Sequence, residues 1–244
     1  MSNLRTPCAI QVVLLLFYHF LAKTTTLVLQ IRYIMICFCK FLFKKINFAA
    51  MTITSLDQLD TNGIYTYADY QLWQFGERVE LLRGKIRQIA APSRKHQDIS
   101  GKIQYALTTA LLKSPCKVYN APFDVRLIRT REDKDAITVV QPDLCVICDP
   151  AKLDARGCNG APDLIIEILS PGNSRTEIKD KFELYQEAGV LEYWVVSPIE
   201  KTIQVWVLNE QGIYIGLQPK VEGDVLTTPI ISNLEVDVTE VFED

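Results

Sequence analysis

The first fifty residues of the chain contain no Asp or Glu, and the first acidic residue is Asp57. The six charged side chains of this stretch are all basic, namely Arg5, Lys23, Arg32, Lys40, Lys44 and Lys45. Subtracting these six from the 26 basic residues of the chain leaves 20 basic and all 29 acidic residues in residues 51–244, a formal net charge of −9. The two parts differ so much in composition that we expect residues 1–50 to lie outside the fold and residues 51–244 to form the domain.

The chain also lacks a clean apolar run of the length that a membrane span needs, about 18 residues. Gln11 and His19 dilute the first apolar stretch, and Arg32 and Lys40 divide the second. No small-x-small cleavage site follows at the distance typical of a secretory signal. We therefore expect Met51 to be the true start, with residues 1–50 as upstream sequence, and the alternative is that these residues are a membrane anchor.

Histidine is scarce, and only four of the seven cysteines lie beyond Met51: Cys116, Cys145, Cys148 and Cys158. Cys145 and Cys148 form a CxxC, but a structural zinc site needs four ligands. Both cysteines also lie in an apolar run, where a free cysteine behaves as a small hydrophobe. We expect free, buried cysteines, a reducing compartment and therefore a cytoplasmic protein.

The remaining sequence alternates helical and strand patterns. Apolar residues recur at helical spacing from His96 to Leu112, a second helix is predicted over 177–188 before Gly189, and Thr66 can cap a short helix that ends near Phe75. Arg83-Gly84 predicts a tight hairpin. Further strands are predicted at 117–120, 124–128, 139–140, 144–148, 163–169, 192–196, 202–208 and 213–217. This pattern predicts an α/β (α+β) domain with a mixed central β-sheet flanked by helices.

Two carboxylates lie where strands rarely accept them. Asp143 directly precedes an apolar strand, and Glu167 lies inside the apolar segment 164–169. A buried, unpaired carboxylate is costly, and a shared divalent cation would satisfy both groups, since carboxylates are the ligands that Mg²⁺ or Mn²⁺ prefers. Because strand side chains alternate, Glu167 shares a face with Ile165. For either residue alone, a strand end or an arginine partner is the simpler explanation.

A helix with a polar stripe follows these strands. Glu177, Lys181 and Tyr185 are each four residues apart and therefore lie on one side of the predicted helix. Lys181 neighbours Phe182 on the buried side, so its ammonium could reach the strand ends and offer a positive charge to a phosphate. The simpler alternative is a solvated lysine paired with Glu177.

These motifs, in this order, resemble a known family. The stretches that carry the resemblance are Glu80-Leu81-Leu82-Arg83-Gly84-Lys85, His96-Gln97, Gln141-Pro142-Asp143-Leu144, Glu167-Ile168-Leu169-Ser170-Pro171, Lys181, Tyr185 and Ala188–Val196. Together they resemble the Uma-type family of restriction-endonuclease-like proteins of bacteria, within the PD-(D/E)XK nuclease superfamily. The resemblance covers about residues 65–243.

The resemblance implies a restriction-endonuclease-like core whose metal lies at the strand ends. It implies Asp143, Glu167, Lys181 and Glu80 as catalytic residues, with Glu177, Tyr185 and His96 in support. It also implies Mg²⁺ or Mn²⁺ held by Asp143, Glu167, the carbonyl of Ile168, and Glu80 as a further ligand or water partner. A strict ExK motif would place its lysine at Leu169, so Lys181 on the next helix takes that role. We thus expect a metal-dependent endonuclease, a hydrolase acting on the phosphodiester bonds of DNA, with no other small-molecule cofactor.

Basic residues near these motifs are candidates for contacts with DNA. One group, expected to bind nucleic acid, comprises Arg83, Lys85, Arg87, Arg94 and Lys95; a second comprises Arg126, Arg129 and Arg131. A charge run is as often a solvated face, and the net charge of −9 argues against broad, tight DNA binding. A homodimer is expected from the resemblance and the apolar segment Val190–Val196.

Two other functions stay open. One is a catalytically inactive nuclease fold that binds nucleic acid or serves as an interaction module. The other is a metal-dependent hydrolase of a different phosphoester.

Overall fold

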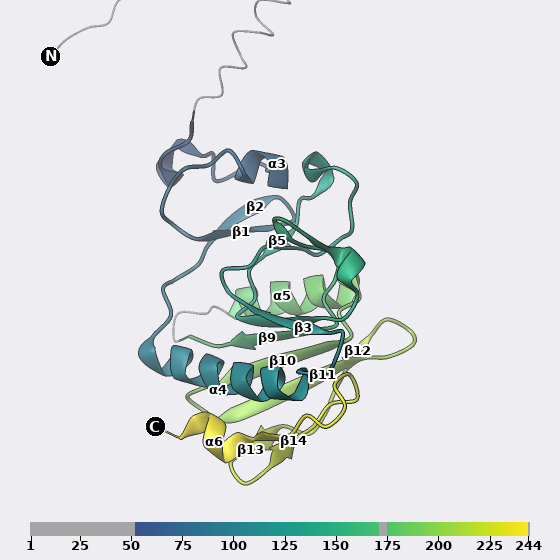
Figure 1. Cartoon of the computed structure of the whole chain (residues 1–244). Helices are drawn as coiled ribbons and strands as arrows, with labels where there is room; N and C mark the ends of the chain where they lie inside the picture. The colour runs from purple at the N-terminus through teal and green to yellow at the C-terminus, as the bar shows by residue number, and fades with distance from the viewer. Residues whose placement is uncertain (1–51, 171–174, 244) are drawn as a thin grey trace, which may run out of the picture. The chain divides into compact units, whose positions relative to one another are not determined.

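The computed structural model describes residues 52–170 and 175–243 (Figure 1). Ile53–Asp244 form a compact unit. The expectations for a start at Met51 or an anchor concern residues outside the described part of the chain. Within the described part, no helix is both long enough and apolar enough to cross a membrane.

Two large sheets make up the unit. One has the strand order β2-β1-β5-β4-β8-β7, and the other has the order β12-β11-β10-β9-β6-β3, with β13 paired to β11. The strands of the first sheet are β1 (Val79–Leu82), β2 (Lys85–Gln88), β4 (Val125–Arg126), β5 (Val139–Val140), β7 (Leu153–Asp154) and β8 (Gly157–Asn159). The strands of the second are β3 (Lys117–Asn120), β6 (Leu144–Ile147), β9 (Leu164–Ile168), β10 (Glu192–Ser197), β11 (Thr202–Leu208), β12 (Tyr214–Gly216) and β13 (Lys220–Val221).

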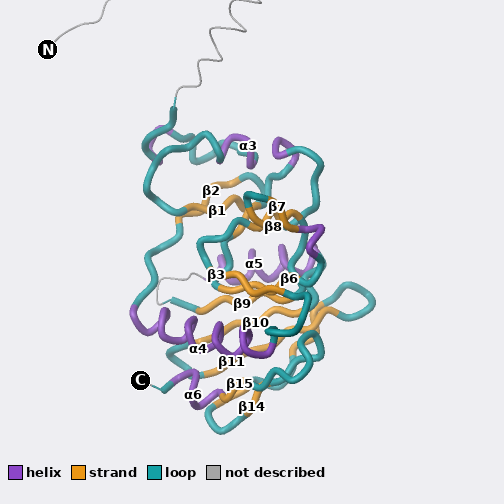
Figure 2. The backbone as a smooth tube through the Cα atoms, in the orientation of Figure 1, coloured by secondary structure: helices purple, strands orange, loops and turns teal. Residues whose placement is uncertain are grey.

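Helices cover these sheets in layers. In Figure 1, α5 (Arg175–Ala188) lies between the β1–β2 hairpin and strands β9 and β10, while α4 (Arg94–Ala110) lies on the other face of the seven-stranded sheet. The buried side chains agree, since Leu184 and Tyr185 of α5 share one core with residues of both sheets. Ile99 and Ile103 of α4 share a second core with the far side of β9. Figure 2 shows the remaining elements, which are α3 (Tyr67–Tyr70), α6 (Val238–Phe242), the β14–β15 pair (Val225–Leu226 and Val236–Asp237) and the 3₁₀ turns Leu56–Gln58, Asp133–Asp135 and Pro150–Lys152.

Local sequence explains where several elements begin and end. Ser93 accepts a hydrogen bond from the His96 N–H and so caps α4. Gly189 follows α5 with a φ of 84°, a conformation that glycine adopts without strain. Arg83 and Gly84, with φ of 51° and 80°, form the two-residue turn that the sequence predicts between β1 and β2.

The α+β class is confirmed, but several details differ from the expectation. There are two large sheets rather than one central sheet, and the β7–β8 pair was not predicted. The helix capped by Thr66 ends at Tyr70, well before Phe75, because Trp73 forms a bridge with Ile53 and stacks on Phe75.

The apolar strand β10 gives no support to a homodimer. It lies inside the seven-stranded sheet, paired with β9 on one side and β11 on the other. Its backbone edges are therefore both occupied, and its apolar composition reflects burial rather than a free edge. The expected homodimer stays a prediction from the family resemblance alone.

The expectation of free cysteines is wrong for one pair. Cys116 and Cys148 form a disulfide, since the β3–β6 register pairs Lys117 with Ile147 and so brings the two cysteines opposite each other. Cys145 and Cys158 are free and buried, and burial raises the pKa of both thiols, that of Cys158 to about 11. The cysteine content therefore no longer argues for a reducing compartment.

Candidate active site

Asp143 and Glu167 meet across two antiparallel strands. The register pairs Leu144 with Ile166, so one step further Asp143 lies opposite Glu167. Directly opposed residues share a face of the sheet, and here that face is the one that Cys145 and Ile165 present to α5. The Ile168 N–H donates to Asp143 Oδ2 at 2.8 Å, which fixes this carboxylate against the end of β9.

Helix α5 brings a lysine and a tyrosine onto Glu167. Lys181 Nζ donates to Glu167 Oε1 at 2.9 Å, and the hydroxyl of Tyr185 donates to the same oxygen. Phe182 packs edge-on against Trp206 and so anchors the helix to the sheet. Lys181 is only 8% exposed, so it is a buried partner of Glu167 and not a solvated surface lysine. Glu177, one turn earlier, is half-buried.

Glu80 completes the cluster from the other sheet. Its Oε1 lies 3.1 Å from Lys181 Nζ and accepts the Gln141 N–H at 2.8 Å. Its Oε2 is buried and has no hydrogen-bond partner among the described residues. The Lys181 ammonium therefore lies between two carboxylates, Glu80 on β1 and Glu167 on β9, and links the two sheets.

His96 approaches the cluster from the opposite helix. Its Nε2 lies 3.1 Å from Asp143 Oδ2, and its ring is 6% exposed. Nδ1 is buried without a partner among residues 52–170 and 175–243. The side chain therefore orients Asp143 from the first turn of α4.

Burial dominates the electrostatics of this cluster. Burial, assisted by the charges of Asp143 and Glu80, raises the pKa of Glu167 to about 7, although the Lys181 charge and the Tyr185 hydrogen bond act in the other direction. Burial alone would lower the pKa of Lys181, but Glu167 and Glu80 raise it well above its ordinary value. In the same way, the contact with Asp143 outweighs burial and raises the pKa of His96.

The donor set fits a divalent cation in its chemistry. Asp143 Oδ2 and Glu167 Oε1 accept the hydrogen bonds described above, while Asp143 Oδ1 and Glu167 Oε2 accept none from the described residues. Two carboxylates with free oxygens and a nearby backbone are ligands typical of Mg²⁺. However, the described residues contain no ready-made cluster of three His, Cys, Asp or Glu side chains that could hold a metal. The position between Glu80 and Glu167 is already taken by an ammonium, so Glu80 fits better as a partner of Lys181 than as a metal ligand.

The basic residues expected to bind DNA already have partners within the chain. Arg83 pairs with Glu187, Arg87 with Asp180 and Arg94 with Asp98. Lys85 donates to the carbonyl of Asn62, and Lys95 to that of Phe242. Their contact with DNA stays a prediction, and for the arginines it would compete with a carboxylate in the same chain.

Arg126 is not part of a solvated basic group. It is 2% exposed, pairs with Asp133 and Asp154, and stacks over the Tyr67 ring. A buried arginine enclosed by carboxylates has a structural role in the β4–β8 region, so the expected surface group at 126–131 is wrong for this residue.

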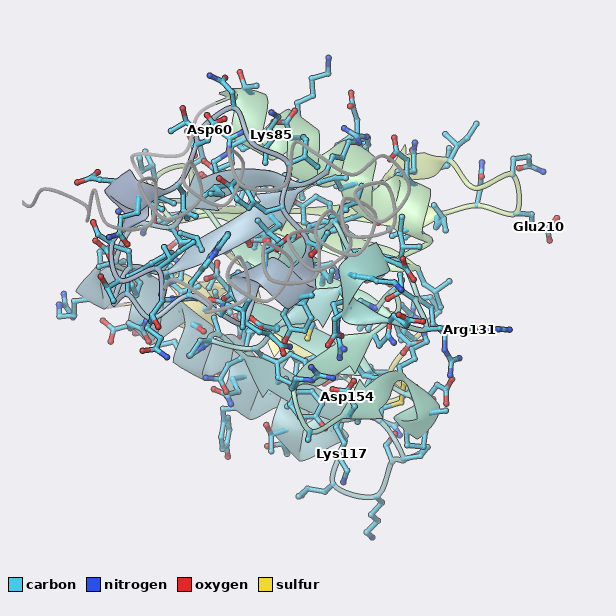
Figure 3. All side chains as sticks on the ribbon, turned by 90° about the horizontal axis from the view of Figure 1, so that it is seen from above. Asp60, Lys85, Lys117, Arg131, Asp154 and Glu210 are labelled. Carbon is cyan, nitrogen blue, oxygen red and sulfur yellow. A yellow bond between two sulfur atoms is a disulfide. The ribbon has the colours of Figure 1, made fainter. Side chains whose placement is uncertain are left out.

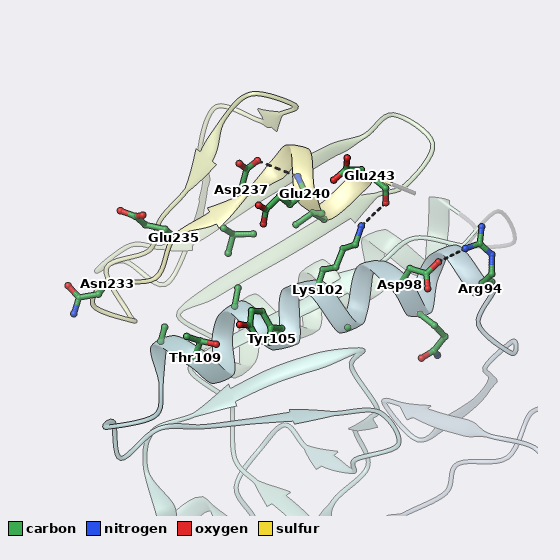
Figure 4. Close-up of a pocket in the computed structure, with 16 residues that line it drawn as sticks. Arg94, Asp98, Lys102, Tyr105, Thr109, Asn233, Glu235, Asp237, Glu240 and Glu243 are labelled. Carbon is green, nitrogen blue, oxygen red and sulfur yellow. Dashed lines mark hydrogen bonds and ion pairs between the residues drawn. The ribbon is translucent and has the colours of Figure 1, made fainter.

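An open groove of about 1160 Å³ lies elsewhere, between α4 and the C-terminal segment (Figure 4). None of Asp143, Glu167, Lys181 and Glu80 lines it. Its charged lining is mostly acidic, with Asp98, Glu235, Asp237, Glu240 and Glu243 against Arg94 and Lys102. Such a lining repels phosphates, so the groove is a poorer candidate for a phosphodiester site than the cluster of Asp143, Glu167, Lys181 and Glu80.

One residue of the site could not be recognised from the sequence. Gln141 links Glu80 to Arg78 through its backbone and its side chain, although it is 61 positions from the first and 63 from the second. Its place directly before Pro142-Asp143 was the only available signal.

The fold and this cluster define a nuclease-like protein. The structure is similar to the crystal structure of a protein from Anabaena variabilis described as "a putative nuclease belonging to DUF820", with a TM-score of 0.55 and 21% identity over 73% of this chain and 97% of that one. The sequence profile of the Uma2 family, described as "Putative restriction endonuclease", matches residues 67–239. The chain belongs to this family, as the motifs predict. An uncharacterized protein of Synechocystis sp. is 24% identical over 173 residues, which cover 70% of this chain and 88% of that protein.

Proposed function

We propose that the protein is an endonuclease that hydrolyses phosphodiester bonds of DNA and depends on Mg²⁺ or Mn²⁺ held by Asp143 and Glu167. The observation that carries the proposal is the contact of the buried Lys181 with both Glu167 and Glu80. Beside this contact, Asp143 and Glu167 each keep one carboxylate oxygen that accepts no hydrogen bond from the described residues. Membership of a family described as restriction endonucleases supports the same function. DNA as the substrate and the metal requirement are parts of the proposal.

Each residue has a role in this proposal. When bound, the cation would polarise the phosphodiester and lower the pKa of a water molecule. Asp143 and Glu167 would hold it, with the carbonyl of Ile168 as a third ligand. Lys181 supplies a fixed positive charge for the charge that develops on the phosphate oxygens. Glu80 holds the lysine in place, Tyr185 holds Glu167 in place, and His96 orients Asp143.

Calorimetric titration of the full chain with Mg²⁺ and Mn²⁺ tests the metal site. We expect binding by the wild type, its loss in Glu167→Gln and Asp143→Asn, and its retention in Glu80→Gln, which serves as the matched carboxylate control. A plasmid-nicking assay then tests the reaction. We expect the wild type to nick plasmid DNA when the metal is present, and Glu167→Gln and Asp143→Asn to leave it intact. Equal binding in all four proteins would contradict the ligand set.

One observation favours a second candidate, an inactive nuclease fold that binds nucleic acid. Among the described residues, no three His, Cys, Asp or Glu side chains form a cluster that could hold a metal ion. This candidate predicts that the wild type binds DNA equally well with and without Mg²⁺ and never cleaves it. A cleavage assay over DNA, RNA and nucleotide substrates separates the two candidates and also tests for another phosphoester.

A further inference from the structure

Arg78 differs from most arginines in the described chain. Arg83, Arg87, Arg94, Arg126 and Arg156 each make an ion pair with a carboxylate. Arg78 makes none, although it is half-buried and lies two residues before Glu80 of the site. Its charge is therefore not neutralised by a carboxylate in direct contact.

The guanidinium of Arg78 is held by a neutral group. Its Nε and one terminal nitrogen both donate to Gln141 Oε1, at 3.0 and 2.9 Å. An arginine has five N–H donors in a rigid fork, so this contact leaves the other terminal nitrogen with both of its hydrogens. The fork is fixed in orientation while part of it stays available to a ligand.

Gln141 ties this arginine to the candidate active site. Its backbone N–H donates to Glu80 Oε1 at 2.8 Å, and Glu80 in turn contacts Lys181. Its side-chain nitrogen donates to Asp124 Oδ1 at 2.8 Å and to the hydroxyl of Tyr70 at 3.2 Å. These two acceptors fix the amide, so that its oxygen faces Arg78. One residue thus positions both a cation and a site carboxylate, and the residue two places later is Asp143.

We infer that Arg78 binds a backbone phosphate of the substrate next to the bond that is cleaved, an inference that rests on the proposed function. A planar guanidinium matches the geometry of a phosphate group. A cation that is already oriented loses little side-chain entropy on binding, and half-burial strengthens its interaction. By contrast, Arg83, Arg87 and Arg94 would first have to leave a carboxylate. Gln141 is then the positioning residue for this phosphate contact.

DNA affinity as a function of salt tests the inference without any cleavage. The full chain binds a fluorescein-labelled 30-base-pair duplex, measured by anisotropy without divalent metal between 50 and 200 mM NaCl. We compare the wild type with Arg78→Gln, Arg78→Lys and the control Lys117→Gln. Lys117 is exposed, belongs to neither basic group, and lies across the view from Lys85 of the β1–β2 hairpin (Figure 3). The logarithm of the binding constant falls linearly with the logarithm of the salt concentration. Each lost phosphate contact reduces the magnitude of this negative slope by about 0.9.

We expect Arg78→Gln to weaken binding about tenfold and to reduce the magnitude of the slope by about 0.9, as the loss of one charge-assisted contact predicts. Arg78→Lys should restore the slope, because an ammonium also neutralises one phosphate, although it lacks the fork that Gln141 holds. A purely structural arginine would leave the slope of all three variants unchanged. Wild-type binding with an unchanged slope in Arg78→Gln overturns this inference alone, whereas a wild type that binds no DNA here and cleaves none with Mg²⁺ overturns the proposed function with it.

Discussion

The seven-stranded sheet carries acidic side chains on both of its faces, Glu192 on one and Asp143 and Glu167 on the other, and the two faces satisfy them differently. On the α4 side, Glu192 accepts hydrogen bonds on both oxygens, from the Trp194 indole and from the Thr228 hydroxyl. On the α5 side, Asp143 and Glu167 each keep one oxygen to which no described residue donates a hydrogen bond, and one oxygen of Glu80 is buried without a partner among the described residues. The first cluster is closed, and the second is open to a further ligand.

The two clusters also differ in charge. Glu192 meets two neutral donors, and burial raises its pKa although both hydrogen bonds act in the other direction. On the α5 side, Glu80 and Glu167 contact the ammonium of Lys181, and Asp143 contacts the ring of His96. A carboxylate whose two oxygens both accept hydrogen bonds is satisfied within the fold, whereas neighbouring carboxylates that keep unpartnered oxygens are costly unless another cation binds. The difference separates a structural carboxylate from those proposed to be functional.

Removal of the Lys181 charge should break the open cluster most strongly. We expect Lys181→Met to lower the rate of DNA cleavage about 10²–10³-fold, because in the proposed mechanism this side chain supplies the positive charge that faces the reacting phosphate. Lys179→Met is the matched control, since Lys179 is an exposed lysine of the same helix that pairs with Glu183. Cleavage rates of both variants and the wild type, with circular dichroism as a check on folding, provide the measurement. Similar rates for the two variants would remove Lys181 from the mechanism.

Glu80→Gln, in the same cluster, should lower the cleavage rate less than Lys181→Met does. The amide keeps an acceptor for the Gln141 N–H but loses one of the two charges beside Lys181. We expect kcat to fall about tenfold while the affinity for Mg²⁺ stays unchanged, because in the proposed mechanism Glu80 positions the lysine and does not hold the metal. Single-turnover cleavage at several Mg²⁺ concentrations measures both quantities. A shift in the Mg²⁺ dependence would make Glu80 a ligand instead.

Local patterns in the sequence predicted the side chains that the α5 face presents. The strand period of two placed Glu167 on the face of Ile165, and the helical period placed Lys181 in line with Tyr185. The tight turn at Arg83-Gly84 and the long helix α4 followed from residues close to one another in the chain. These features depend on neighbours within a few positions, which a single sequence contains.

Contacts between distant segments could not be predicted in this way. Glu192 accepts a hydrogen bond from Thr228, which lies 36 positions away in the chain, and Gln141 accepts one from Arg78, which lies 63 positions away. The Cys116–Cys148 pairing depends on the register of β3 and β6, which no cysteine spacing specifies. The number of sheets was also missed, because the pairing of β1 with β5 and of β5 with β4 joins segments distant in the chain. The β7–β8 pair was missed because both strands are short.

Thr228→Val should open the closed cluster and lower stability without affecting cleavage. It leaves Glu192 Oε2 buried without its donor, which costs about 1–3 kcal/mol. The Ile230 N–H loses its acceptor as well, so the variant is compared with the double variant Glu192→Gln/Thr228→Val and with Glu192→Gln alone. Denaturant unfolding of the four proteins gives the coupling energy between the two positions. A coupling energy near zero would mean that the hydroxyl does not stabilise the carboxylate.

The pH dependence of the Glu192→Gln variant should show the smallest effect. Because burial raises the pKa of Glu192 in the folded protein, the folded state binds its proton more tightly than the unfolded state does. The stability that this proton contributes is present below the unfolded pKa, about 4.3, and is lost as the pH rises through the folded pKa. Glutamine cannot ionise, so the free energy of unfolding of the variant, relative to the wild type, should increase between pH 4 and pH 8. Denaturant unfolding of both proteins at the two pH values measures this difference, and a value that does not change would mean that Glu192 ionises as easily in the fold as in water.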